Sequence, residues 1–491
     1  MGEISHKPSL VDGADERRWL SIMNKKIGVT LLVLIISSCV LLSAGVIIGA
    51  YLLLKAQKNY TDPLLSLRNT PAVATVPAAQ QTQTAVPSDG LPPKIAKQMD
   101  EIQQQVIAIR GLHMTADLKR DLLTPEELKD KVINDFFADY SDEDALKDSK
   151  VLSTLGLLDE GFDLKQFYLD LYSEQIAGYY DSETKDMYVI AGEGFGGMER
   201  MTYAHEFNHV LQDQNYDLEN GMKLNDDYCK VDTEYCAAVS ALIEGDSVST
   251  EQEWFLKHST RQDQKDLFSF QEEYTSPVYG SAPAYMKEDF LFLYTFGLDF
   301  VQQLINQGGW AAVDAAYANP PVSTEQILHP EKYPDDQPVP VEMPDLAGML
   351  GDDWSELDRN VMGEWYTYLV FAKGRSSQFS MDDEKSKTAA AGWGGDTYVY
   401  YATADLKEHL FAWRSTWDTS SDAGEYFDMS RDYGLARWGI PVQNSNGVVS
   451  WNSTSDGIIT MRRSGADVLW VIGSSKEVVD DALAEIKDFG K

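Results

Sequence analysis

A run of 28 residues without a single charge, from Ile27 to Leu54, restricts the fold of this chain more than any other feature. As an α-helix the run would be about 42 Å long, enough to cross a bilayer with some tilt. A secretory signal would have a shorter apolar core and a small-residue cleavage site near its end. The alternative is a lipidated Cys39, but fifteen apolar or small residues follow it, where a lipoprotein would turn polar. Residues 27–54 are therefore predicted to be a transmembrane anchor.

Charge and composition on either side of this run predict the orientation of the chain. Lys and Arg residues at 17, 18, 25 and 26 precede the run, which favours a cytoplasmic tail over residues 1–26. Residues 55–94 are rich in Pro, Thr, Gln and Ala and have few large apolar side chains, so they are predicted to be a disordered linker. Residues 95–491 would then form an extracytoplasmic domain on a single-pass protein of the cell membrane.

The net charge is −37, from 41 Lys and Arg against 78 Asp and Glu. A surface this acidic repels nucleic acid, and no basic stripe offsets it. Nucleic-acid binding is therefore excluded as a function, and the sequence specifies no oligomeric state.

The exported part is predicted to be an α+β domain, mainly helical with a small sheet. Helical periodicity runs through residues 95–112, and the residues TPEE at 124–127 are typical of a helix start with Thr as N-cap. Aromatic and β-branched runs on both sides of residues 181–186 predict a β-hairpin. The chain is expected to be mainly helical to about Asp345. Strands are expected later, for example at 397–402 and 468–472.

The strongest chemical signal is His-Glu-Phe-Asn-His at 205–209, in a chain with only seven histidines. On a helix, residues four apart have β-carbons roughly 5–6 Å from each other, so both imidazoles can bind one ion. Glu206 lies beside that line and can reach a water molecule without being a ligand. Apolar residues at 201, 204, 207, 210 and 211 form a separate packing stripe. The pattern predicts a zinc site with His205 and His209 as ligands and Glu206 as general base.

Catalytic zinc needs a third protein ligand and an open position, and two His with one Glu is a known set. The best candidate is Glu244, which lies 35 residues beyond His209 in a mostly apolar helical stretch over 238–248. A lone carboxylate there is costly unless it is paired or bound to metal, and a buried salt bridge is the alternative. Three nearby residues can support the ligands, with no preference among them: Asp246, Ser247 and Glu251.

The chain has only three cysteines, so it is not a disulfide scaffold. Cys229 and Cys236 are separated by six residues and could form a small local bridge outside the cytoplasm. A zinc knuckle fits less well, because no second Cys or His pair lies nearby.

The histidine segment and the Glu244 segment resemble a bacterial, largely uncharacterised family of zinc metallopeptidases of the gluzincin type, with the pattern HExxH…E. The two segments are AHEFNHVLQDQNYDL at 204–218 and ALIEGDSV at 241–248. The resemblance covers roughly residues 100–480. Further similar stretches are IAIRGL (107–112), LGLLDEGFDL (155–164), IAGYYDSETKDMYVI (176–190), GGWAAVDAAYANPPVSTEQILHPEKY (308–333), GWGGDTYVYY (392–401) and WRSTWDTSSDAGEY (413–426).

The resemblance implies a zincin-like (gluzincin) fold with Zn²⁺ held by His205, His209 and Glu244. It places the hairpin strand near 187–190 beside the metal helix, as an edge along which a peptide extends. It also calls for a donor to the oxyanion of the transition state. Two residues compete for that role: Tyr294, in a Tyr-x-x-Gly helix like that of some gluzincin aminopeptidases, and His329, since an imidazole serves in other members. Tyr294 as core and His329 as support of the Pro330 turn are the alternatives.

The predicted function is a membrane-anchored zinc metallopeptidase that hydrolyses peptide or protein substrates outside the cytoplasm. One alternative is a membrane-tethered, non-catalytic scaffold that keeps zinc for structure. A structural site needs no general base and usually closes the fourth position, so Glu206 argues against it. The other alternative is a zinc amidohydrolase that acts on a non-peptide substrate of the cell envelope.

Overall fold

The computed structural model describes residues 91–136, 140–175, 178–181, 184–190, 194–487 and 489. The predicted tail, the predicted anchor at 27–54 and the predicted linker up to residue 90 lie outside these residues. Within the part that is described, no helix combines the length and the apolar character needed to cross a membrane.

The first part of the described chain holds a long helix, several shorter helices and a small sheet. The helix predicted at 95–112 is confirmed as α4. The predicted cap before α5 is confirmed, because Thr124 Oγ1 accepts from the N–H of Glu127 and the Glu127 carboxylate accepts from the N–H of Thr124. The elements are α4 (Pro93–Arg110), β1 (Lys119–Leu123), α5 (Pro125–Phe136), α6 (Asp142–Thr154), α7 (Leu164–Gln175), β2 (Gly178–Asp181) and β3 (Asp186–Ile190).

The predicted hairpin is confirmed, with β2 antiparallel to β3. The expectation that residues 187–190 form an edge is wrong, because β1 pairs in parallel on the other side of β3 and the strand order is β1-β3-β2. β1 joins the sheet from 67 residues earlier in the chain, with Lys119 opposite Asp186. Among the described strands β2 pairs with β3 alone, so it lies at the edge of this sheet.

The middle of the chain is helical, as predicted. Helices α10 and α13 form its centre and run in the same direction, with Gln302 Nε2 donating to Ser249 Oγ at 3.1 Å. They cross where Gly245 meets Gly297, so closely that a Cβ on Gly245 would lie 2.1 Å from the Gly297 carbonyl oxygen. The elements are α8 (Gly197–Tyr216), α9 (Asp226–Cys229), α10 (Thr233–His258), α11 (Arg261–Glu273), α12 (Pro277–Ser281), α13 (Ala284–Gly308), α14 (Trp310–Ala318), α15 (Thr324–Leu328) and α16 (Ala347–Leu350).

The last part of the chain forms a seven-stranded antiparallel sheet in the order β4-β5-β6-β10-β9-β8-β7. The strands predicted at 397–402 and 468–472 are confirmed within β5 and β10. This sheet is larger than the small sheet expected from the sequence. The elements are β4 (Trp354–Asn360), α17 (Gly363–Ala372), α18 (Asp383–Ala390), β5 (Trp393–Thr403), β6 (His409–Trp417), α19 (Ser420–Trp438), β7 (Gln443–Ser445), β8 (Val448–Ser453), β9 (Gly457–Ser464), β10 (Asp467–Gly473) and α20 (Lys476–Glu485).

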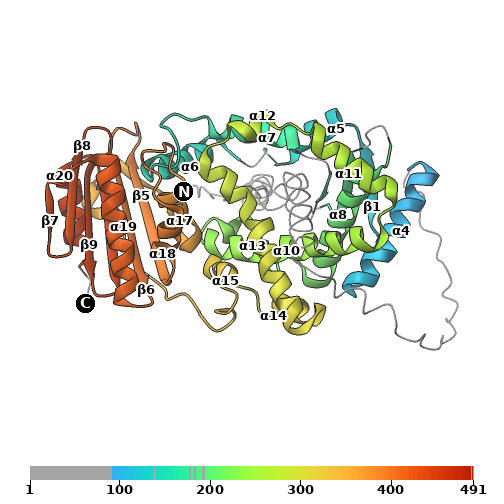
Figure 1. The fold of residues 1–491 in the computed structure, drawn as a ribbon. Coiled ribbons are helices and arrows are strands. Elements are labelled where there is room, and N and C mark those ends of the chain that lie inside the picture. The colour runs from blue at the N-terminus through green and yellow to red at the C-terminus, as the bar shows by residue number, and fades with distance from the viewer. Residues whose placement is uncertain are drawn as a thin grey trace, which may run out of the picture.

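Both faces of the large sheet are covered, which explains why β5 is buried along nearly its whole length. Val399 and Tyr401 pack on the side of α20, whereas Tyr398 and Tyr400 pack into the main core with α19. Figure 1 shows this sheet at one end of the molecule, α10 and α13 in the middle and α4 at the other end.

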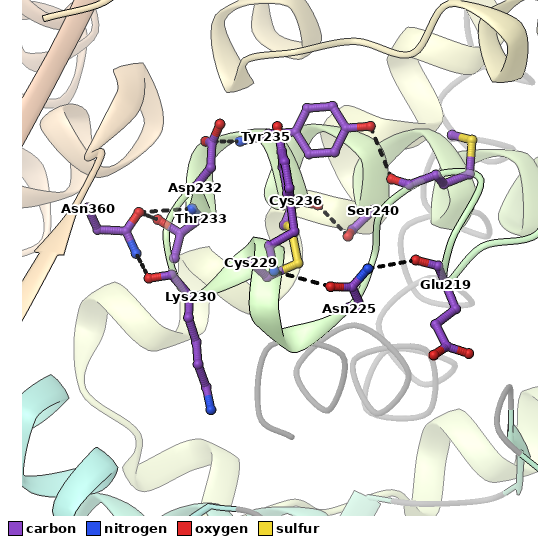
Figure 2. The surroundings of a disulfide bond; sticks show 12 residues. Glu219, Asn225, Cys229, Lys230, Asp232, Thr233, Tyr235, Cys236, Ser240 and Asn360 are labelled. Carbon is purple, nitrogen blue, oxygen red and sulfur yellow. Dashed lines mark hydrogen bonds between the residues drawn. A yellow bond between two sulfur atoms is a disulfide. The ribbon is translucent and has the colours of Figure 1, made fainter. Parts of the chain in front are cut away.

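A disulfide joins Cys229 to Cys236 at the start of α10, so the bridge considered from the sequence is present. Figure 2 shows that it lies among hydrogen bonds from neighbouring turns. Asp232 caps α10 by accepting from the Tyr235 N–H at 3.0 Å, and Asn360 accepts from the Thr233 N–H at 2.9 Å. The bridge therefore fixes the N-terminal end of the helix that carries Glu244.

Loss of the disulfide is expected to lower stability moderately. The bridge closes a loop of about eight residues, for which chain entropy gives roughly 2.5 kcal/mol. We expect the double variant Cys229→Ser, Cys236→Ser to lose about that much free energy of unfolding, measured by urea denaturation. A reductant should lower the wild-type midpoint and leave the variant unchanged. Equal midpoints for the oxidised wild type and the variant would contradict the prediction.

Candidate metal centre

Helix α8 carries His205, Glu206 and His209 in its middle turns. It begins after Gly196, whose N–H donates to Glu199 Oε2 at 2.9 Å, and it ends at Asp217, which has a left-handed backbone. The apolar stripe inferred for this helix is too narrow, because every residue from 201 to 213 is buried. Helices α4, α10 and α11 and the small sheet pack around it. The polar groups of α8 must therefore find partners inside the protein.

The two histidines and Glu244 converge on one point. His205 Nε2 and His209 Nε2 are 3.1 Å apart. Glu244 Oε2, from α10, lies 3.3 Å from His205 Nε2 and 3.6 Å from His209 Nε2. Ligand atoms about 2.0–2.1 Å from a tetrahedral zinc ion lie roughly 3.3–3.4 Å from one another. The three separations therefore fit one zinc ion held by these atoms.

Glu244 Oε2 is buried and forms no hydrogen bond within the part of the chain described. Two imidazole nitrogens face it, yet neither donates to it with hydrogen-bond geometry. A buried carboxylate oxygen without a partner is costly, and a cation is the partner that it lacks. The chemistry of the three atoms thus fits a bound zinc ion.

The electrostatics of the cluster agree with this fit. Burial alone lowers the pKa of His205, but the neighbouring carboxylates of Glu244 and Glu251 outweigh burial and hold that pKa well above its ordinary value. Burial alone raises the pKa of Glu244, but the two histidines outweigh it and lower that pKa. The surroundings of the three side chains thus favour an ionised Glu244 carboxylate with positive charge beside it.

The outer nitrogens of both histidines are held by side chains, as in many zinc sites. Glu251 Oε2 lies 2.9 Å from His205 Nδ1. Gln212 Oε1 lies 2.8 Å from His209 Nδ1, and the Ser247 hydroxyl lies 3.2 Å from the same nitrogen. Of the three candidates left open by the sequence, Glu251 and Ser247 thus contact the histidines directly. Gln212 was missed, although its position three residues after His209 on a helix is a usable signal.

Glu206 is fully buried beside the edge strand β2. The backbone N–H of Tyr180 donates to Glu206 Oε2 at 3.1 Å, so the outer side of β2 faces the carboxylate. The Tyr180 hydroxyl donates to Asp213 Oδ2 at 2.7 Å, one turn beyond His209. Burial raises the pKa of Glu206, against the effect of the two histidines. No local pattern indicates Tyr180, because the contact joins residues that are 26 positions apart in the chain.

The third candidate, Asp246, anchors the metal-binding helices to α4. Arg110 Nε donates to Asp246 Oδ1 at 2.7 Å, and its Nη2 donates to Asp314 Oδ1 at 2.9 Å. Asn208 Nδ2 and the Tyr317 hydroxyl reach the same Asp246 carboxylate at 3.3 and 2.9 Å. Both charged side chains of the Arg110–Asp246 pair are fully buried. With these partners the pair joins the four helices α4, α8, α10 and α14.

The two proposed oxyanion donors lie in different surroundings. Tyr294 is buried on α13, one turn before Gly297, which touches the helix that carries Glu244. His329 ends α15, and its Nε2 lies 2.8 Å from Glu364 Oε1 on α17. The partners of His329 are Glu364 and Glu331, so no contact connects it to the metal cluster in the described residues. The contact that the structure shows joins α15 to α17, and the role of His329 as oxyanion donor stays a prediction.

Replacement of His329 by Gln is expected to change stability in a pH-dependent way and to leave zinc content unchanged. The hydrogen bond to Glu364 raises the pKa of His329 above its ordinary value. A raised histidine pKa contributes stability that is complete below about pH 6.5 and is lost as pH rises through the folded-state value. His329→Gln should therefore lower Tm by roughly 1–2 °C at pH 5.5 and by less at pH 8.5. A larger Tm loss at pH 8.5 than at pH 5.5 would contradict this assignment.

Comparison with known proteins concerns the C-terminal sheet. Residues 352–483 match the family described as "Domain of unknown function (DUF8575)". This segment runs from just before β4 into α20 and does not include the metal cluster. Neither a curated protein nor a solved structure matches the chain.

Proposed function

We propose that this chain is a zinc-dependent metallopeptidase of gluzincin-like architecture, anchored by residues 27–54 and acting outside the cytoplasm. The observation that carries the proposal is the convergence of His205, His209 and Glu244 at 3.1–3.6 Å, with the carboxylate of Glu206 on the same helix. The separations suit a tetrahedral ion, and Glu206 supplies the base that a structural site does not need.

His205, His209 and Glu244 would hold the ion. Zinc supplies, when bound, a Lewis acid that lowers the pKa of a water molecule and polarises the carbonyl under attack. The carboxylate of Glu206 takes the proton of the attacking water and delivers it to the leaving amine nitrogen. The Tyr180 N–H holds Glu206 Oε2, so the base is already oriented before substrate binds. Glu251 and Gln212 keep both imidazoles turned so that Nε2 faces the ion.

The position of β2 at the edge of the described sheet favours a peptide over other amides. An extended chain can add to a strand edge through backbone hydrogen bonds. On β2 the N–H of Tyr180 lies against Glu206, so a chain laid along that edge would pass beside the base. The Cys229–Cys236 bridge agrees with a compartment outside the cytoplasm, since disulfides are rare inside it.

The test is cleavage of casein by the full chain, purified in detergent and loaded with zinc. We expect cleavage that stops with a chelator and returns when zinc is added back. Bound zinc without cleavage of any unfolded protein would favour the zinc scaffold. Zinc-dependent cleavage of a cell-envelope amide, with no action on casein, would favour the amidohydrolase.

A further inference from the structure

A cavity of about 460 Å³ lies on the C-terminal sheet, apart from the metal cluster. Arg414 and Thr416 of β6 and Asp467 of β10 line it, together with residues 485–487 at the end of α20. Arg414 pairs with Leu469, and Thr416 pairs with Asp467 in the next row of the same face. Leu469 packs against α20. The cavity therefore lies on the face of the sheet that α20 covers, beside the C-terminal end of that helix.

Residues 339–344, which we call the strap, form a second wall of the cavity. The Val339 N–H donates to the Gly394 carbonyl oxygen at 2.7 Å. The strap passes so close to β5 that a Cβ on Gly395 would lie 2.2 Å from the Val339 carbonyl oxygen. Met343, near the other end of the strap, is buried in the core under α20. The two glycines thus let the strap lie against the sheet, and its Pro and Val side chains give the cavity an apolar wall.

The cavity contains opposite charges that do not neutralise each other. Arg414 Nη1 donates to the Glu342 carbonyl oxygen at 3.2 Å, and Arg414 forms no ion pair within the described part of the chain. A guanidinium has five N–H donors, so most of them stay available. The Asp467 carboxylate has neither an ion pair nor a hydrogen bond among the described residues. The other carboxylate from the sheet side, Glu485, already pairs with Lys487 at 3.3 Å.

The spacing of the two free charges indicates the size of a ligand. Asp467 is the diagonal neighbour of Arg414 on the same face, and such neighbours lie roughly 7–8 Å apart. Two residues of an extended peptide span about 6.6 Å. A guanidinium binds a carboxylate through two parallel hydrogen bonds, and a carboxylate accepts from an ammonium group. The cavity volume is in the range of about 300–1,000 Å³ that is usual for small-molecule sites.

The charges at the rim argue against a plain anion as the ligand. Glu342 and Glu485 line the same cavity as Arg414, so a ligand that carried only negative charge would be repelled. A ligand with one charge of each sign meets a partner for both. Apolar side chains on that ligand would pack against the strap.

We propose that this cavity binds a short peptide of two or three residues with free ends, its carboxylate on Arg414 and its ammonium group on Asp467. The proposal goes beyond the peptidase function and does not depend on it, because neither the metal ligands nor Glu206 line the cavity. The structural alternative is that Arg414 only supports the strap through the Glu342 carbonyl and that the cavity holds water.

The experiment is isothermal titration calorimetry on the full chain that carries Glu206→Gln, purified in detergent with zinc, so that cleavage does not interfere. Three ligands would be compared: alanyl-leucine, its N-acetyl form and its C-terminal amide. We expect the free dipeptide to bind about tenfold more tightly than either blocked form. With Arg414→Gln added, the free dipeptide and the amide should bind within twofold of each other. With Asp467→Asn added, the free dipeptide and the N-acetyl form should do so.

The matched control is Arg431→Gln, which removes a positive charge from α19, a helix that packs into the core on the other face of the sheet. It should keep both tenfold ratios, and cooperative melting would show that each variant is folded. If Arg414 only supported the strap, Arg414→Gln would weaken all three ligands equally and leave the ratios unchanged. A dipeptide bound at the metal cluster would likewise keep its ratios in both variants. Either result, or no binding of the free dipeptide by the parent protein, would overturn the proposal.

Discussion

Replacement of Glu206 by Gln is expected to lower the rate of casein cleavage by roughly 10²–10⁴-fold, while the protein keeps its zinc. The glutamine amide has nearly the shape of the carboxylate, and its oxygen can still accept from the Tyr180 N–H. It cannot take a proton from water, so the loss should appear in kcat. Zinc content should not change, because the ligand atoms belong to His205, His209 and Glu244.

A suitable control is Glu219→Gln, which removes a charge from a side chain that points away from the disulfide in Figure 2 and accepts no hydrogen bond in the described residues. It should leave both rate and zinc content unchanged. If Glu206→Gln cleaved casein within threefold of the wild-type rate, Glu206 would not be the general base.

Replacement of Arg110 by Met is expected to cost about 3–5 kcal/mol of unfolding free energy, because it breaks a buried ion pair. Arg110 is fully buried and pairs with Asp246 and Asp314, and its guanidinium lies 4.5 Å from the centre of the Trp310 ring. Methionine fills part of the volume but leaves the Asp246 carboxylate buried without a cation. Urea denaturation of wild type and variant would measure the difference.

The comparison for this prediction is Arg359→Met. Arg359 pairs with Glu356 at 2.7 Å, but both side chains are about one-third exposed, so the loss should stay below about 1 kcal/mol. If Arg110→Met cost no more than Arg359→Met, the buried network behind the ligands would not hold these helices together.

The local parts of the candidate site could be predicted from the sequence. The spacing of His205 and His209 follows from helix geometry alone, and Glu244 was recognisable as one carboxylate in an apolar stretch. The first inference needs only the geometry of an α-helix, and the second needs only the free-energy cost of burying a charge. The β2–β3 hairpin and the helix cap at Thr124 could also be predicted, because each forms between residues that are close in the sequence.

The parts that failed depend on contacts between distant segments. Arg110 and Asp246 are 136 residues apart, and nothing near either residue indicates the other. β1 joins β3 in parallel across 67 residues, and this pairing turns the expected edge strand into the central one. The burial of α8 on all sides likewise follows from three helices and a sheet that meet only in the folded chain. Hydrophobic periodicity shows which face of a helix is apolar, but it does not show how many other elements pack against that helix.

The most direct test of the central claim is the zinc content of the purified full chain and of its Glu244→Gln form, measured as metal per chain after dialysis at pH 7. Glutamine keeps the size of Glu244 but removes the charge that completes the ligand set at 3.3 and 3.6 Å from the two imidazole nitrogens. The account predicts one zinc per wild-type chain and less than about one-tenth of that in the variant, with both proteins folded. Equal zinc in both proteins, or none in the wild type, would contradict it.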